Sequence, residues 1–554
     1  MQLSVDQHYV TWDDFVRAVN GIEARALLHA LADHDRRYGD TSRTDHWATY
    51  YPPTMALMAR VLLTGPKDGR KPLTPGSFPR LLRMGNALVD YGRAELRADP
   101  TDAARTAMAI RWAHRSAIEG HWRPYYQFAR LYYLLRDGGV WDQLTVRSTV
   151  DIGSEVRALY GFDHRSIFGV AFALYCVGQR GPIRRREFFS NSVSAHALQD
   201  VLDALLARIM RRADEYPVIW ANDKRYQSAA QYPLTAFNPL REFPLVEDPG
   251  DPDLLLTPSR FFLMDRMTLG LYYELVEVFA QRKRDKYPNR DPQDLQAYNN
   301  EMTTFWGGAI ERYVYIQLRQ LRRGTVTPAF RYVADGRTID GPDISVVDNH
   351  GVAFVEVKAK TPRLELRASG NLEELEDHFA MGVAYGHVQN LIHINNLRSG
   401  LLTLKGVRAN DFVQSIVVCP EPVYLFDLPL IRRRFEAAVD RVAEKRKCDF
   451  RIRYDCTVLG LDDLETLVPN AHLFGGFCRV IAKYSDYRRS TCHRIAGPEV
   501  DFNAHYFVPW FHDLLHDASK RLLPNTLLDA EWQRLCDEAK GLMQLEVERP
   551  STSE

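Results

Sequence analysis

Apolar residues recur every three or four positions through the first half of the chain and alternate with polar residues in parts of the second half. The first spacing is typical of helices that bury one face. It predicts amphipathic helices over residues 12–33, 78–95, 101–119, 122–135 and 195–212. We therefore expect a largely α-helical N-terminal lobe.

The second half of the chain carries helix and strand patterns in a definite order. Short apolar runs and alternating runs are typical of strands, whereas longer stretches with helical spacing are typical of helices. The expected elements are a helix at 304–321, strands at 326–333 and within 342–358, a helix at 372–397, a strand at 413–419, a helix at 428–445, a strand at 449–458 and a short helix at 462–467. This order predicts an α+β domain with a mixed central sheet.

Changes in composition suggest where the domains divide. Residues 236–260 are rich in proline and acidic residues, which favours an extended, ordered connection over a helix. We expect a helical domain of unknown role at 1–235, this connection and a bridging helix at 236–295, the α+β domain at 296–475 and a mostly helical extension at 476–554.

Overall composition limits the classes of protein to consider. The 554 residues are 45% hydrophobic, and 71 basic residues balance 71 acidic ones, so any surface that binds nucleic acid must be local. The seven cysteines form no Cys-x-x-Cys pair, which favours reduced thiols. The first residues lack a secretion leader, and the longest apolar run, 167–177, is too short to span a bilayer. We expect a cytoplasmic protein with no membrane partner.

Candidate chemistry gathers in residues 342–358. Side chains alternate between the faces of a strand, so Glu356 and Lys358 must point the same way. Asp348, Asn349, His350 and Gly351 have the composition of a tight turn, in which Asn and Gly would supply positive φ angles. Pairing the two strands across that turn would bring Asp343, Glu356 and Lys358 to one face of the sheet.

Two adjacent carboxylates on an apolar sheet usually have a cation between them, because their charges repel and are costly to bury. Oxygen ligands favour Mg²⁺ or Mn²⁺ over zinc. Such an ion can polarise a phosphate oxygen and lower the pKa of a water, while Lys358 can orient that water or neutralise developing charge. The residue types therefore point to phosphodiester hydrolysis.

At these residues the chain resembles the PD-(D/E)XK superfamily of restriction-endonuclease-like nucleases. Pro342-Asp343 matches the first part of its motif, and Glu356-Val357-Lys358 matches the second. The resemblance implies an α-β-β-β-α-β core, which is the order of elements expected from residue 304 onward. It also implies that Asp343, Glu356 and the carbonyl of Val357 bind the metal.

Two helix residues join this candidate site. Glu311 lies at helical spacing from Gly307, Gly308, Val314, Tyr315 and Leu318, and a carboxylate on that small and apolar face needs a partner. Many members of the superfamily carry a glutamate on this helix that faces the metal, so the resemblance assigns Glu311 to the site. It also suggests Gln389 as a supporting residue, although His393 stands where some members have an aromatic residue.

The resemblance implies a Mg²⁺- or Mn²⁺-dependent nuclease that cleaves nucleic acid, DNA rather than RNA, and leaves 5′ phosphates. Its arrangement is like that of nucleases of bacterial defence, DNA repair or mobile elements, in which a partner or a second lobe restrains or targets cutting. By this analogy, a protein partner or regulator would bind through the helical N-terminal lobe. Arg322 and Arg323, at the end of the Glu311 helix, are candidates for phosphate binding.

Other interpretations of the same residues stay open. Asp343, Glu356 and Lys358 can form an ordinary surface salt-bridge network, or the fold can persist as a catalytically silent module that binds nucleic acid or protein. A third hypothesis places a metal-dependent phosphohydrolase at His512 and His516, one helical turn apart.

Overall fold

The structure is a computed structural model that describes most of the chain. The described residues are 10–38, 52–66, 71–98, 124–135, 150–189, 195–222, 238–288, 301–359, 372–420, 426–427, 429–448, 450, 454–496 and 523–543. The expected helix at 101–119 and the histidines at 512 and 516 lie outside these ranges.

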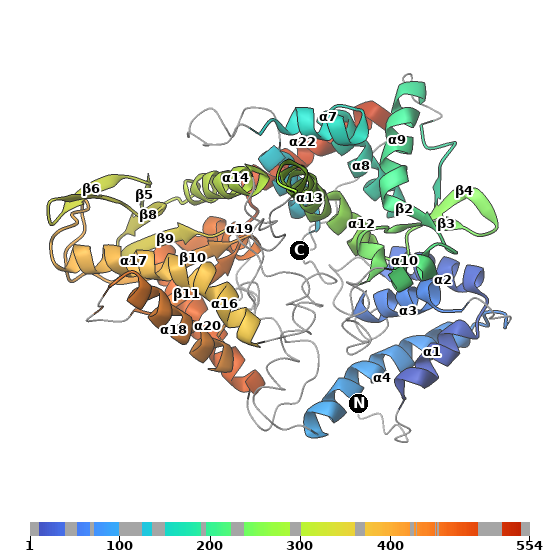
Figure 1. Cartoon of the computed structure of the whole chain (residues 1–554), viewed down its shortest axis with the longest axis horizontal. Coiled ribbons are helices and arrows are strands. Elements are labelled where there is room, and N and C mark those ends of the chain that lie inside the picture. The colour runs from blue at the N-terminus through green and yellow to red at the C-terminus, as the bar shows by residue number, and fades with distance from the viewer. Residues whose placement is uncertain are drawn as a thin grey trace.

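Helices form most of the described chain before residue 300, as the apolar spacing predicts. They are α1 (Trp12–Asn20), α2 (Ala24–Tyr38), α3 (Pro52–Thr64), α4 (Ser77–Ala98), α6 (Pro124–Leu135), α7 (Ile152–Tyr160), α8 (His164–Gly178), α9 (Ala195–Ile209), α10 (Tyr216–Asn222), α12 (Arg260–Met267) and α13 (Leu269–Lys286). Figure 1 shows them on the blue-to-green side of the molecule.

A small sheet of four strands lies within this helical region. Its strands are β1 (Ile183–Arg184), β2 (Met210–Arg212), β3 (Leu245–Asp248) and β4 (Asp251–Leu256), in the order β1-β4-β3-β2. The proline-rich connection is extended, as predicted, and forms the β3–β4 hairpin after the 3₁₀ turn η3 (Pro239–Arg241). The sequence pattern missed this sheet because β1 and β2 are too short to show alternation.

The second half of the chain builds a mixed sheet of five strands. The helix α14 (Glu301–Leu318) leads into β5 (Thr325–Pro328), β8 (Ile344–Asp348), β9 (Gly351–Val357), β10 (Val413–Cys419) and β11 (Cys456–Gly460). The sheet order is β11-β10-β9-β8-β5, with antiparallel pairing from β5 to β9 and parallel pairing from β9 to β11. The expected mixed sheet is confirmed.

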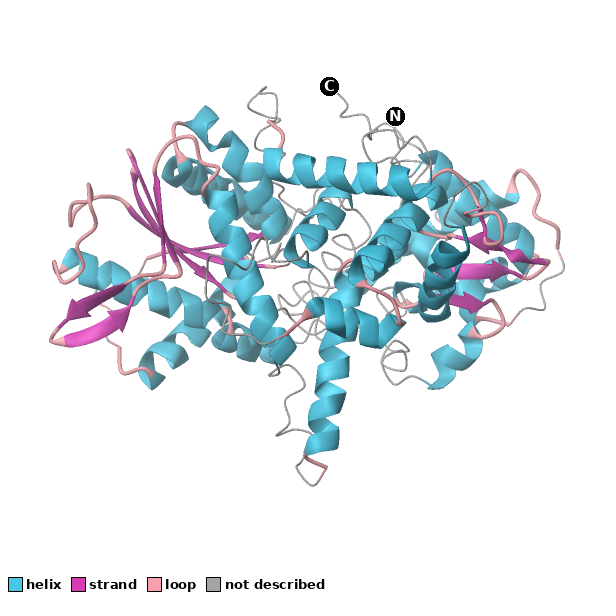
Figure 2. Ribbon diagram, turned by 90° about the horizontal axis from the view of Figure 1, so that it is seen from above, coloured by secondary structure: helices cyan, strands magenta, loops and turns pink. Residues whose placement is uncertain are grey.

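The prediction of one strand at 326–333 is wrong about where that strand ends, because the chain leaves the sheet after Pro328. Residues after it form a separate two-stranded hairpin of β6 (Arg331–Ala334) and β7 (Arg337–Asp340). Proline lacks the amide hydrogen that would continue the ladder. This hairpin projects beyond the sheet in Figure 2.

The turn between β8 and β9 requires glycine at one position. Gly351 has φ of 143°, and a Cβ there would lie 2.1 Å from the carbonyl oxygen of Phe412. Asn349 does not adopt the positive φ that the sequence suggested. The register Asp348↔Gly351 and Ile344↔Val355 fixes the hairpin and with it the positions of the candidate site residues.

Helices cover both faces of the five-stranded sheet (Figure 1). On one face lie α16 (Leu372–Met381), α17 (Val383–Arg398) and α18 (Pro429–Lys445). On the other lie α14, α19 (Leu461–Asn470), the 3₁₀ turn η4 (Ala471–Phe474) and α20 (Phe477–Ala496). Alternation along β9 explains this sandwich, because Phe354 packs under α17 while Val355 joins the core on the α14 side.

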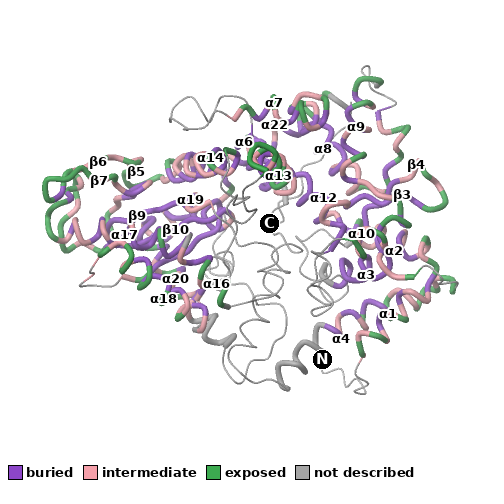
Figure 3. The backbone as a smooth tube through the Cα atoms, viewed as in Figure 1, coloured by how far each residue is buried: buried purple, intermediate pink, exposed green. Residues whose placement is uncertain are grey.

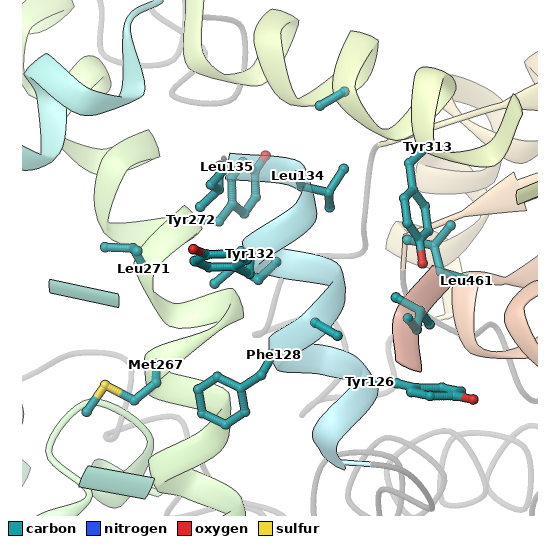
Figure 4. Close-up of a cluster of buried hydrophobic side chains, with 14 of the residues drawn as sticks. Tyr126, Phe128, Tyr132, Leu134, Leu135, Met267, Leu271, Tyr272, Tyr313 and Leu461 are labelled. Carbon is teal, nitrogen blue, oxygen red and sulfur yellow. The ribbon is translucent and has the colours of Figure 1, made fainter. Parts of the chain in front are cut away.

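The apolar core continues from the sheet into the helical region across residue 295. It joins α6, α8 and α13 with α14, β9 and β10, and the last described helix, α22 (Thr526–Met543), packs on α6 and α8. Purple segments in Figure 3 follow this path, and Figure 4 shows side chains of α6, α13 and α14 within it. Among the described helices, none is long and apolar enough to cross a bilayer.

Candidate active site

The hairpin β8–β9 brings the two motif acids together. Asp343 directly precedes β8, and the register places it beside Glu356, near the end of β9. The amide of Val357 donates a hydrogen bond of 2.8 Å to Oδ2 of Asp343, and the amide of Asp343 donates one of 3.4 Å to Oε1 of Glu356. The backbone beside each acid therefore donates a hydrogen bond to the side chain of the other acid.

Lys358, the residue after β9, lies with its ammonium between these acids. Its Nζ is 2.6 Å from Oε2 of Glu356 and 3.9 Å from Oδ2 of Asp343. The side chain of Glu356 is 0% exposed, while those of Asp343 and Lys358 are 25% and 18% exposed. Solvent therefore reaches the site on the side of Asp343 and Lys358.

Glu311 approaches the same place from α14. A Cβ at Gly307, one turn before it, would lie 4.0 Å from Cβ of Ala359, so this face of α14 lies against the chain that leaves β9. Glu311 interacts electrostatically with both Asp343 and Lys358. The structure thus brings Asp343, Glu356 and Lys358 into contact, with Glu311 near enough to interact electrostatically with Asp343 and Lys358. We call these four residues the Lys358 cluster.

The Lys358 cluster holds more negative charge than its one lysine balances. Burial raises the pKa of Glu356 to about 7, and the charge of Asp343 adds to this shift while Lys358 opposes it. Burial and then Asp343 raise the pKa of Glu311 to about 7 as well. Burial lowers the pKa of Lys358, but Glu356 and Asp343 outweigh it and the pKa is raised. Such unbalanced carboxylates favour a bound cation.

α17 closes the site from the other face of the sheet. A Cβ at Gly386 would lie 2.9 Å from Cε of Lys358 and 3.3 Å from Cβ of Glu356, so only glycine lets the helix approach this closely. Tyr385 is exposed, and its ring lies 5.9 Å from Nζ of Lys358 and 4.2 Å from the guanidinium of Arg446. Sequence reasoning missed Gly386, although a glycine three positions before Gln389 within a helix pattern was a usable indication.

Gln389 lies on the helix face that covers the site strand. Helical spacing places it between Gly386, which touches Lys358, and His393, whose ring lies 6.0 Å from that of Phe354 on β9. Its Oε1 is buried and has no hydrogen-bond partner. His393 is itself held by the hydroxyl of Tyr332, 2.9 Å from Nδ1, so it supports the fold beside Gln389.

Arg322 and Arg323 do not join the Lys358 cluster. Both are exposed in the turn that leads into the edge strand β5. Thr325, just after them, pairs with Val347, whereas Asp343 precedes Ile344 at the other end of β8. Three residues of strand, roughly 10 Å, separate the two ends. The arginines can contact a phosphate only at a distance from the acids.

The arrangement does not by itself form a metal centre. Within the described ranges, no three His, Cys, Asp or Glu side chains are placed to hold a metal ion together. The ammonium of Lys358 occupies the space between Asp343 and Glu356. The carboxylate oxygens of the Lys358 cluster are ligands that suit a divalent cation, provided that Lys358 moves away from Glu356.

Comparison with known proteins adds no relative. No protein-family model, no curated protein and no solved structure matches this chain.

Proposed function

We propose that the protein is a Mg²⁺- or Mn²⁺-dependent nuclease whose active site is the Lys358 cluster. The observation that carries this proposal is the meeting of Asp343, Glu356 and Lys358 at the end of β9, with the side chain of Glu356 0% exposed. Burial and the charge of Asp343 raise the pKa of Glu356, and also that of Glu311 on α14, to about 7. A protein without a use for this site would gain stability by replacing one of these acids. The order α14, β5, β8, β9, α17, β10 also resembles the core of the PD-(D/E)XK superfamily.

Each residue of the Lys358 cluster has a distinct role in this proposal. Asp343 and Glu356, with the carbonyl of Val357 and the assisting acid Glu311, would hold the metal ion. When bound, Mg²⁺ supplies charge neutralisation and Lewis-acid activation of the phosphate. Lys358, released from Glu356, donates a hydrogen bond to the attacking water or to a phosphate oxygen, where it stabilises the negative charge of the transition state.

DNA is the proposed substrate, with defence or repair as the setting. The exposed ring of Tyr385, near Lys358, provides a stacking surface, and the guanidinium of Arg446, over that ring, adds a positive charge. Arg322 and Arg323, at the far end of β8, suit a phosphate away from the scissile bond.

A second candidate function is a catalytically silent module that binds nucleic acid or protein. The contact of 2.6 Å between Lys358 and Glu356 favours it, because this pair satisfies the buried acid without a metal. The two candidates differ in whether the pair opens when a divalent cation is present.

The test is cleavage of plasmid, linear duplex, single-stranded DNA and RNA by the purified protein with Mg²⁺ or Mn²⁺. Asp343→Asn and Lys358→Ala should each reduce cleavage by about 100-fold or more. Asp340→Asn is the matched control, because this aspartate lies three positions earlier, is 84% exposed and contacts Arg331 rather than the site. Binding that survives EDTA, without cleavage of any substrate, would support the silent module instead.

A further inference from the structure

A second group of buried charges lies where the helical region meets the sheet. Arg130, from α6, donates two hydrogen bonds of 2.6 Å to the carboxylate of Glu465 and also pairs with Asp462 of α19. The hydroxyl of Tyr313, from α14, donates to Oε1 of Glu465. We call Arg130, Asp462, Glu465 and Tyr313 the Arg130 cluster.

The Arg130 cluster continues through buried amides to the start of α22. Nε2 of Gln317 donates a hydrogen bond of 2.8 Å to the hydroxyl of Tyr313. Nδ2 of Asn525 donates one of the same length to Oε1 of Gln317. The amide of Asn525 in turn donates to the hydroxyl of Tyr126 on α6. Tyr313, Gln317 and Asn525 are all 0% exposed. Figure 4 shows Tyr313 extending from α14 toward Leu461, with Tyr126 on the neighbouring helix.

Each cluster includes one residue of α14, and these two residues lie on different faces of that helix. Glu311 and Gly307 share the face of α14 that lies toward the end of β9, since they are one turn apart. Tyr313 and Gln317 are also one turn apart, and they face α6 and α19. Glu311 and Tyr313 are two positions apart, which separates their directions by roughly 200° on a helix.

Rotation or sliding of α14 would therefore disturb both clusters at once. Tyr313 would leave Glu465, which is buried and would lose one of its donors, and that loss is costly. Gln317 would leave Asn525, the residue that caps α22 by accepting from the amide of Leu528. The hydrogen bonds of the Arg130 cluster thus specify one rotation of α14.

We propose that Arg130 and Tyr313 are positioning residues, which act through α14 to hold Glu311 beside Asp343 and Lys358. This inference rests on the proposed function of the Lys358 cluster. It makes the helical region a determinant of metal affinity, although none of its described residues is placed in the Lys358 cluster.

A similar buried group inside the helical region provides a control that distinguishes positioning of α14 from the general loss of a buried hydrogen bond. The hydroxyl of Tyr160 on α7 donates a hydrogen bond of 2.8 Å to Glu274 of α13, and Glu274 also forms ion pairs with Arg266 and Arg208. Tyr160→Phe removes a buried tyrosine–glutamate hydrogen bond of the same kind without touching the contacts of Tyr313. It is the matched control for Tyr313→Phe.

The experiment measures Mn²⁺ affinity by calorimetry on the full-length protein and its variants. Tyr313→Phe keeps the buried ring and should weaken Mn²⁺ binding by about tenfold, as the loss of an outer partner of a metal ligand does. Tyr160→Phe should leave the affinity unchanged. In a Glu311→Gln background, Tyr313→Phe should have no further effect, because the residue through which it acts is already lost.

Each other outcome has a defined meaning. If the unmodified protein binds no Mn²⁺, the proposed function and this inference fall together. If it binds Mn²⁺ and Tyr313→Phe binds equally well, only the inference is overturned. The inference is also overturned if Tyr160→Phe weakens binding as much, or if Tyr313→Phe still weakens binding in the Glu311→Gln background.

Discussion

The Arg130 cluster and the Lys358 cluster are both buried groups of acids around one base, yet they are satisfied to different degrees. Both oxygens of Glu465 accept short hydrogen bonds, from a two-pronged arginine and from Tyr313. Glu356 has one such bond, from Lys358, and a long contact of 3.4 Å from the amide of Asp343. The difference lies in the number of donors and in their geometry.

The charges that act on the buried glutamate also differ between the two clusters. Burial raises the pKa of Glu465, as it does that of Glu356, but the next largest influence on Glu465 is the positive charge of Arg130, which opposes the rise. After burial, the largest influence on the pKa of Glu356 is the negative charge of Asp343, which raises it further. One cluster is therefore closed by the protein itself, and the other is left with negative charge for a ligand to neutralise. A functional site is more readily found in the second kind.

The largest expected effect is on stability and concerns the Arg130 cluster. Arg130→Gln removes the cation that pairs with the buried carboxylate of Glu465, which should cost about 3–5 kcal/mol in urea unfolding. Lys358→Gln should cost less, because Asp343 is partly exposed and Glu356 can take up a proton. Equal losses in the two variants would remove the distinction between the clusters.

Glu356→Gln should instead stabilise the metal-free protein at alkaline pH. The folded-state pKa of about 7 lies above the ordinary value of 4.5, so the folded protein holds a proton that the unfolded chain releases. Stability therefore falls as pH rises between these values, and the loss is complete above the higher one. The variant avoids a loss on the order of 1–3 kcal/mol, measured in EDTA by thermal unfolding against pH. A variant less stable than the parent at about pH 8 would contradict this.

A methyl group at position 386 tests whether cleavage depends on the position of the Lys358 side chain. In Gly386→Ala the new Cβ must displace Lys358, whose Cε would be 2.9 Å away. We expect cleavage to fall about tenfold or more, because small misplacements of catalytic groups are costly, while stability changes by about 1 kcal/mol. Gly541→Ala, in open space on α22, is the control. Unchanged cleavage by Gly386→Ala would exclude a role for the position of Lys358.

The smallest effect belongs to an exposed ion pair that serves as the reference for both clusters. Arg331 and Asp340 contact each other at 2.8 Å across the β6–β7 hairpin, with side chains 69% and 84% exposed. Arg331→Ala should change the free energy of unfolding by less than about 1 kcal/mol, since water screens such pairs. A larger change would mean that the geometry of an ion pair, rather than its burial, determines how much stability is lost when the pair is broken.

Local patterns predicted the meeting of the acids and most strands of the sheet, but the strand expected at 449–458 was misplaced, since β11 begins only at Cys456 and runs to Gly460. The apolar run at 413–419 became β10 with the same bounds, and period-two alternation placed Glu356 and Lys358 on one face beside Asp343. Glu311 was found because a carboxylate on a face of small and apolar residues needs a partner. These features depend on neighbours within about one helical turn or one strand pair.

Features that depend on how distant segments pack could not be predicted. Arg130 and Glu465 are 335 positions apart, and no local pattern links α6 to α19. The contact of Gly386 with Lys358 depends on how α17 lies on the sheet. The break after Pro328 and the φ angle of Asn349 were missed because turn geometry is specified by tertiary contacts as well as by residue type.

The most direct test of the central claim is Mg²⁺ binding by the parent protein and by Glu356→Gln, measured by calorimetry in the same buffer. The parent should bind Mg²⁺ more tightly as pH rises from about 6 to 8, because Glu311 and Glu356, with pKa values of about 7, must first lose their protons. Glu356→Gln should bind at least about tenfold more weakly. Equal binding by the two proteins, or none by either, would show that the Lys358 cluster is not a cation site.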